Sequence, residues 1–428
     1  MKKYIFIIIT LLVLSVLCIV FNHHTVIIDK EKKVSTIKSH INTIRSISPK
    51  DTTFTDLIFL KDLLKDKSIV MLGEATHIDG ATFLGKSRLI KFLHKELGFD
   101  VIIYETGLYD TYNLWKKIKE TSKPNPKNFS EALYNFWYDN KENEYLINYI
   151  LQNVNTNKEI EIAGFDVQFT GQIKNNERDL LLNEYLKTQN GIDLKVFPSF
   201  YTIKKFYSSY VNSWVFKSLS RSKQDSVLSD IQSIVSVLEE IKLPNQTDSL
   251  YIRFFKNLNV LYTYTWKHQY LSERRFQIRD SAMAENFIWL KENKFKNRKV
   301  IIWAANLHIS YDNYSYYPTP ARFNSMGEYI KKKYGSQCYS INFTSFSNNT
   351  KSGSSEEAYN NKTIEYLLHQ IHEPYLYLDF NSIDSSSFLH DPIIMNCNQN
   401  LSFNAYWSKI TDGILYIDNM TELHKLKE

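Results

Sequence analysis

The sequence predicts an α/β fold in which a mostly parallel sheet is flanked by helices and carries a large helical insertion. Two observations predict the sheet: short apolar runs typical of buried strands, and intervening stretches whose apolar residues recur at helical spacing. Strands that alternate with helices in this way form parallel sheets covered on both faces. A third observation, the lack of any strand pattern over residues 172–298, predicts the insertion.

Seven short segments rich in Ile, Val, Leu and Tyr are the predicted strands. They are Ser68–Gly73, Asp100–Glu105, Glu159–Gly164, Lys299–Ala304, Gln337–Phe343, Tyr375–Asp379 and Gly413–Asp418. Apolar residues at helical spacing predict a helix over Arg88–Leu97, and another over Val227–Ile241 inside the insertion.

The chain of 428 residues is long enough for one α/β core with an insertion. We predict a membrane anchor or signal segment over residues 1–22, followed by a tether and a first helix over 23–53. The α/β catalytic-like domain comprises residues 54–171 and 299–428, and the helical insertion comprises residues 172–298.

The N-terminus indicates where the protein resides. Lys2 and Lys3 precede an uncharged, mostly apolar run over residues 4–21, which is about the length that spans a bilayer. We expect an uncleaved membrane anchor with the body of the protein outside the cytoplasm. A cleaved signal, or a lipid on Cys18, is the alternative.

Charge, cysteine content and missing motifs exclude several classes of protein. The net charge of +6 is spread over short lysine clusters, whereas a nucleic-acid-binding protein would gather it on one face. Cys338 and Cys397 could form one disulfide, but no CxxC pair indicates a cysteine zinc site. The lack of Walker A and GxSxG sequences argues against an NTPase and an ordinary α/β-hydrolase.

Four predicted strands are each followed by ionisable side chains. The segments are Gly73-Glu74-Ala75-Thr76-His77, Tyr104-Glu105-Thr106-Gly107, Gly164-Phe165-Asp166-Val167-Gln168 and Trp303-Ala304-Ala305-Asn306-Leu307-His308. Ligands of open parallel sheets bind at the carboxyl ends of the strands, so these side chains are expected to line one cleft. The sequence therefore predicts a polar site with several carboxylates and two histidines.

These residue types predict acid–base chemistry on a small molecule. A carboxylate at Glu74 can orient the imidazole of His77 and raise its basicity, which makes His77 a candidate general base for water. Glu105 could hold an arginine, and Arg88 is the candidate partner or an anchor for a substrate oxyanion. His308 could donate to a developing oxyanion or transfer a proton.

Two further residues and one alternative complete the predicted site. Asp166 and Asn306 are candidate substrate-binding residues, although Asp166 could instead cap a following helix. No cofactor is expected. The same His and carboxylate groups could hold a divalent metal, but the chain has no HExxH spacing, so a metal site is the second interpretation.

Five ordered blocks resemble the erythromycin esterase family. They are Gly73–His77, the Glu105-Thr106-Gly107 turn, Gly164–Gln168, Arg279–Leu290 and Trp303–His308. Met326-Gly327 and the strand from Gln337 also fit, so the resemblance spans about Asp66 to Phe343, roughly 65% of the chain. The resemblance implies hydrolysis of an ester or lactone by water activated at His77. It also implies an active site formed by Glu74, His77, Arg88, Glu105 and His308.

One departure from the family pattern leaves three hypotheses open. The last block of the family reads Trp-Ala-His-Asn-x-His, and here Ala305 replaces the first histidine. The first hypothesis is a metal-independent hydrolase of an ester or lactone. The second is a metal-dependent hydrolase or peptidase that uses the same residues, and the third is a catalytically silent binding protein tethered to the membrane.

Overall fold

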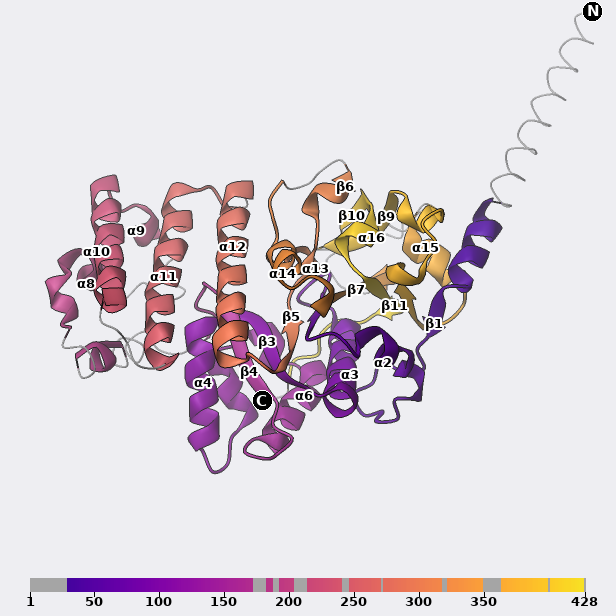
Figure 1. Ribbon diagram of the computed structural model, residues 1–428, viewed down its shortest axis with the longest axis horizontal. Helices are drawn as coiled ribbons and strands as arrows, with labels where there is room; N and C mark the ends of the chain where they lie inside the picture. The colour runs from indigo at the N-terminus through magenta and orange to yellow at the C-terminus, as the bar shows by residue number, and fades with distance from the viewer. Residues whose placement is uncertain are drawn as a thin grey trace, which may run out of the picture.

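The computed structural model describes residues 29–171, 182–187, 192–203, 214–240, 246–270, 272–317, 322–348, 363–398 and 401–426 (Figure 1). The predicted anchor over residues 4–21 lies outside the described residues and stays a prediction. Among the described residues, no helix combines the length and the apolar character that a membrane crossing requires.

The centre of the molecule is an eight-stranded sheet with the strand order β1-β8-β11-β7-β2-β5-β3-β4. Its strands are β1 (Ile41–Thr43), β2 (Ile69–Leu72), β3 (Phe99–Gly107), β4 (Glu161–Asp166), β5 (Lys299–Trp303), β7 (Cys338–Asn348), β8 (Tyr375–Asp379) and β11 (Gly413–Met420). The strands from β11 to β4 are parallel, whereas β8 and β1 are antiparallel to their neighbours. The predicted mostly parallel sheet is confirmed, and each of the predicted strands is present.

Four strands were not predicted from the sequence. One is β1 at the edge of the large sheet, and the others, β6 (Tyr316–Tyr317), β9 (Ile393–Asn398) and β10 (Leu401–Ala405), form a small antiparallel sheet. β1 and β6 have only three and two residues, and β10 is partly exposed. Pairing with neighbours holds these strands in place, and β9 also contributes the buried Ile393, Met395 and Cys397 to a core.

Helices cover both faces of the large sheet (Figure 1). Those in and around the α/β region are α2 (Phe59–Leu64), α3 (Gly80–Leu97), α4 (Leu108–Glu120), α5 (Asn135–Tyr138), α6 (Lys141–Asn153), α13 (Asn306–Ile309), α14 (Met326–Tyr334), α15 (Ile364–His369) and α16 (Trp407–Ile410). Residues 29–38 form a further helix that precedes β1.

The described parts of residues 172–298 are helical and contain no strand. Their helices are α8 (Pro198–Ile203), α9 (Trp214–Lys217), α10 (Arg221–Glu240), α11 (Gln246–Lys267) and α12 (Glu273–Trp289). In Figure 1 they stand side by side beyond the β4 edge of the sheet, and α12 is the one that packs on β4. This packing brings residues of α12 to the carboxyl ends of the strands.

The alternation of side chains along the strands builds two cores. In β2, Ile69 and Met71 belong to the core shared with α10, α11 and α12, whereas Val70 and Leu72 belong to the core shared with α3 and α6. The remaining cysteines, Cys338 and Cys397, are buried free thiols, so the disulfide considered from the sequence is not formed.

Candidate active site

The carboxyl ends of the neighbouring strands β2, β5, β3 and β4 bring the predicted polar side chains to one edge of the sheet. Glu74 follows β2, Glu105 lies near the end of β3, and Asp166 ends β4. His308 lies on α13, the short helix that follows β5. Because parallel strands end at the same edge, residues that are far apart in the sequence form one cluster.

Glu74 is fully buried and is held by side chains from several elements. Its Oε1 lies 2.7 Å from Nδ1 of His77 and accepts from Nε1 of Trp137 at 3.3 Å. Its Oε2 accepts from Nζ of Lys86 at 2.7 Å and from Nε1 of Trp303 at 2.6 Å. Burial would raise the pKa of Glu74, but Lys86 and His77 outweigh it and lower the pKa. The carboxylate is therefore ionised and fixed in orientation.

His77 connects this buried carboxylate to the surface. Its side chain is 37% exposed, whereas that of Glu74 is 0% exposed. The imidazole stacks on the ring of Phe136 with a centroid distance of 4.8 Å, and Nε2 has no hydrogen-bond partner among the described residues. Burial lowers the pKa of His77, but Glu74 and then Glu105 outweigh it, so the pKa is raised. The ring thus has one nitrogen anchored and the other available to a water or a substrate.

Lys86 is a site residue that the sequence reasoning missed. It lies on α3, its side chain is fully buried, and besides Glu74 its only acceptor within 3.5 Å among the described residues is the carbonyl oxygen of Ala304. Burial lowers the pKa of Lys86 to about 8, even though Glu74 opposes the shift. A signal was present in the sequence, since Lys86 shares helical spacing with Ile90 and Leu93 on the buried face of the helix.

Arg279 of α12 forms the second half of the cluster. Its Nη2 lies 2.9 Å from Oε1 of Glu105 and 2.6 Å from Oδ2 of Asp166, and its Nε donates to Oδ1 of Asp166 at 3.1 Å. Burial raises the pKa of Glu105, but His308 and Arg279 outweigh it and bring the pKa well below its usual range. Asp166 therefore holds an arginine of the insertion, and Glu105 does have an arginine partner.

His308 is enclosed by two carboxylates. Nδ1 lies 2.9 Å from Oδ1 of Asp280, and Nε2 lies 3.3 Å from Oε1 of Glu105 and 3.2 Å from Nη1 of Arg279. Burial lowers the pKa of His308, but Asp280 and Glu105 outweigh it and raise the pKa to about 10. The ring is therefore an imidazolium that donates to Asp280 and Glu105, and Arg279 is a neighbouring cation rather than a donor to Nε2.

Asp280, which was also missed, accepts from the backbone N–H of Met326 at 2.9 Å as well as from His308. It joins the start of α14 to the site. Its position directly after Arg279, in the fourth of the five blocks, is the signal that could have identified it. Ala305, which replaces the family histidine, donates its backbone N–H to Oε2 of Glu105 at 3.1 Å.

The predicted pairing of Arg88 with Glu105 is wrong. The Arg88 side chain is 2% exposed, and its Nη1 and Nη2 lie 2.9 Å and 2.7 Å from the two carboxylate oxygens of Asp56. Nη1 also donates to the carbonyl oxygen of Ser46 at 2.6 Å. Residues two apart on a helix point about 200° apart, so Lys86 faces the cluster and Arg88 faces the segment that precedes β2.

Asn306 is buried behind the cluster rather than open to a ligand. Its Nδ2 donates to the carbonyl oxygens of Phe343 and Cys397 at 3.1 Å and 2.8 Å, which joins α13 to β7 and β9. A Cβ atom at Gly73 would lie 2.0 Å from Oδ1 of Asn306, so only glycine allows this close approach. The contacts of Asn306 are structural, and they differ from the predicted contact with substrate.

The described part of the chain contains no set of side chains that could ligate the divalent metal considered from the sequence. Within those residues, no group of three or more His, Cys, Asp and Glu side chains has the arrangement of a metal site. Instead, protein cations neutralise the carboxylates, with Lys86 at Glu74 and Arg279 at Glu105 and Asp166. The negative charges of the cluster are therefore balanced by side chains of the protein itself.

A mostly parallel sheet with a histidine–carboxylate cluster at its carboxyl edge defines an α/β protein with a site suited to acid–base chemistry. The chain belongs to the erythromycin esterase family, whose model matches residues 94–418. The resemblance drawn from the sequence blocks is thereby confirmed, and the membership supports a hydrolase. The range matched by the family model begins beyond Glu74 and His77, and the geometry connects those two residues to the matched part of the site.

Individual relatives agree with this assignment. The chain is 25% identical over 403 residues to YbfO of Bacillus subtilis (strain 168), a presumed hydrolase, and the match covers 86% of each chain. It is 21% identical over 324 residues to erythromycin esterase type II of Escherichia coli, covering 70% of this chain and 74% of that protein. A solved structure of an EreC erythromycin esterase mutant in its open conformation has a TM-score of 0.67 at 16% identity, with 89% of this chain and 98% of that chain covered.

Proposed function

We propose that this protein hydrolyses an ester or a lactone of a small molecule, with a water activated by His77. The observation that carries the proposal is the contact of 2.7 Å between the buried Glu74 carboxylate and Nδ1 of the half-exposed His77 ring. When Nδ1–H donates to Glu74, the lone pair of Nε2 is the basic site. A water bound there loses its proton to Nε2 as its oxygen attacks the carbonyl carbon.

Glu74 in turn depends on its own partners. Lys86, Trp303 and Trp137 donate to its two oxygens and fix the carboxylate toward Nδ1 of His77. This arrangement selects the tautomer of His77 and stabilises the imidazolium that forms when the water is deprotonated. Lys86 contributes charge balance, because a lone carboxylate in this buried position would otherwise take up a proton.

The opposite side of the site would stabilise negative charge on the carbonyl oxygen. Both ring N–H groups of His308 are taken up by Asp280 and Glu105, so Arg279 would supply the donor, through its Nη1, which contacts no carboxylate among the described residues. Glu105 raises the pKa of His77 and His308 lowers it, so the two halves of the cluster interact electrostatically. Positive groups fixed beforehand near the forming oxyanion lower the barrier of acyl transfer.

The proposal is tested by the hydrolysis of a panel of carboxylic esters, lactones and macrolides by the full-length protein, with and without a chelator. We expect turnover of at least one substrate, unchanged by the chelator. Loss of turnover with the chelator would favour the metal-dependent hydrolase. Turnover by Ala305→His but not by the wild type would instead indicate that the wild-type protein is catalytically silent because it lacks the histidine at position 305.

The pH dependence tests the role of Glu74. A base acts in its neutral form, so kcat/KM should rise with pH through the pKa of His77, which Glu74 raises above 6.5. Glu74→Gln should shift this acidic limb to lower pH and reduce the plateau of kcat/KM by about tenfold or more, because the ring loses its charged partner. The double variant Glu74→Gln/Lys86→Met, which removes the buried lysine as well, should show the same shift.

Glu142→Gln is the matched control for this experiment. Glu142 lies 2.7 Å from Nδ1 of His424, the same contact as in the Glu74–His77 pair, but on α6 and the C-terminal segment. We expect its pH profile to match that of the wild type. An acidic limb that does not move in Glu74→Gln would show that His77 is not the titrating base.

A further inference from the structure

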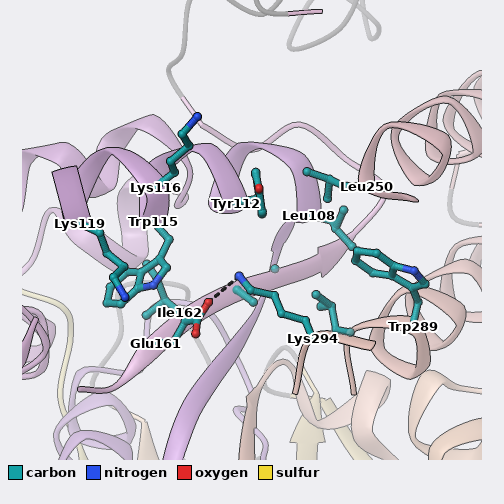
Figure 2. A pocket seen from close by; sticks show the side chains of 13 residues that line it. Leu108, Tyr112, Trp115, Lys116, Lys119, Glu161, Ile162, Leu250, Trp289 and Lys294 are labelled. Atoms are coloured by element: carbon teal, nitrogen blue, oxygen red, sulfur yellow. Dashed lines mark ion pairs between the residues drawn. The ribbon is translucent and has the colours of Figure 1, made fainter. Parts of the chain in front are cut away.

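A second pocket lies away from the active-site cluster, at the free edge of the large sheet (Figure 2). β4 is the last strand in the sheet order, and residues 162–164 of this strand form part of the pocket wall. The other walls come from α4, from the start of α11 and from the C-terminal end of α12. The volume is about 280 Å³, at the small end of ligand pockets. Glu161 and Asp166 are opposite ends of β4, so the pocket and the candidate active site use different ends of one strand.

The interior of the pocket is apolar and aromatic. Leu108, Ala163 and Leu250 line it from the core that includes the insertion, and Trp115 lines it from the core on the other face of the sheet. Figure 2 shows Trp115 and Trp289 at opposite ends of the pocket, with Leu108 and Leu250 close to Trp289. The edge where the two cores meet is therefore left partly unfilled.

Trp115 supplies a hydrogen-bond donor that the protein itself does not use. Its side chain is 4% exposed, and its Nε1 is buried without a hydrogen-bond partner among the described residues. Buried indole N–H groups usually find an acceptor. Because Trp115 lines the pocket, a ligand with an acceptor group could complete this interaction.

The charges at the pocket favour an anion. Lys116, Lys119 and Lys294 line it, and Glu161 is its acidic residue. Nζ of Lys119 also lies 3.0 Å from Oε1 of Glu159, which is not a pocket residue. Glu161 is already neutralised, because its carboxylate lies 2.5 Å from Nζ of Lys294 and 2.6 Å from Nη1 of Arg298. In Figure 2, the side chain of Lys119 lies beside the indole of Trp115, whereas the ammonium group of Lys116 points away from it. The ammonium group of Lys119 and the unused donor thus lie at the same end.

We propose that this pocket binds a small amphipathic monocarboxylate with an aromatic or aliphatic body of about ten heavy atoms, a size that suits a small pocket. The carboxylate accepts from Nε1 of Trp115 and lies close to the ammonium group of Lys119. The apolar body extends toward Trp289 and Leu250. This site is independent of the hydrolysis assigned to the cluster around His77.

The test is calorimetric titration of the full-length protein with 4-phenylbutyrate and with the neutral 4-phenylbutan-1-ol, which has the same body. We expect one molecule of 4-phenylbutyrate per chain and at least tenfold weaker binding of the alcohol. Lys119→Glu should weaken 4-phenylbutyrate binding at least tenfold. Trp115→Phe should reduce the preference for the carboxylate while leaving the affinity for the alcohol within about threefold, because only the N–H group is lost.

Two controls locate the bound probe. Lys117→Glu makes the same charge change on the same helix at a residue that pairs with Glu131 outside the pocket, and it should reduce the affinity by less than threefold. His77→Ala should bind 4-phenylbutyrate like the wild type. Equal affinity for acid and alcohol, no effect of Lys119→Glu, or lost binding in His77→Ala would each overturn the proposal.

Discussion

Replacing His77 with alanine is expected to lower kcat/KM for the hydrolysed substrate by about 10²- to 10⁴-fold, the range that a general base supplies. The half-exposed ring is the only group on Glu74 that reaches the surface, since Lys86 and both indoles on that carboxylate are buried. Lys86 is the other titratable group on Glu74, but its side chain is 0% exposed, so no neighbour should replace the lost nitrogen. The measurement is steady-state kinetics on the substrate identified by the panel, combined with a check that the fold is intact.

His424→Ala is the matched control for that prediction, because His424 also contacts a carboxylate through Nδ1 at 2.7 Å, in this case Glu142. It should retain wild-type kcat/KM. Added imidazole should restore part of the activity of His77→Ala, because a free base can occupy the vacated space. Retention of activity within threefold in His77→Ala would refute His77 as the base.

Replacing Arg279 with methionine is expected to destabilise the protein by about 3–5 kcal/mol, the usual cost of breaking a buried ion pair by removing one partner. The guanidinium is 14% exposed and contacts Glu105 and Asp166, whose side chains are 4% and 0% exposed. Without Arg279, Asp166 loses the one cation that it contacts in the described structure, and both carboxylates remain in a site that water barely reaches. The measurement is the free energy of unfolding from urea titrations.

Arg298→Met is the matched control, because Arg298 also joins two carboxylates, those of Asp100 and Glu161, but its side chain is 29% exposed. An ion pair with this exposure should cost about 1 kcal/mol or less. Adding Glu105→Gln and Asp166→Asn to Arg279→Met should recover much of the lost stability, because no unpaired charge is then buried. Equal losses in Arg279→Met and Arg298→Met would contradict the interpretation of a buried charge network.

The contacts of Arg279 and Asp280 also explain why the helical insertion matters to the active site. Arg279 and Asp280 both come from α12, and through Asp166 and His308 they connect the insertion to strand ends of the α/β region. A change in the position of α12 would therefore move the cation beside Glu105. Any ligand that bridges α12 and the strand ends would act on the same contacts.

Much of the fold could be predicted from the sequence because its signals are local. The apolar runs of β2 and β5 are fully or almost fully buried, and the period of their side chains suits a sheet with a core on each face. The position of Glu74, Glu105 and Asp166 after successive strands followed from the rule that parallel strands end at a common edge. The small sheet was not predicted, because β6 has only two residues and pairs with the distant β10, which is itself mostly exposed or half-buried.

The sequence by itself determined the class of fold, the family and the edge of the sheet at which polar residues gather. Only the tertiary structure decided which charges meet there. Lys86 and Arg88 are two residues apart, yet one lies 2.7 Å from Glu74 and the other 2.7 Å from Asp56. Their spacing points the two side chains to opposite sides of α3, but the carboxylate that each one meets depends on how α3 packs against the rest of the molecule. Local patterns fix elements and edges, whereas ion-pair partners depend on how separate elements dock.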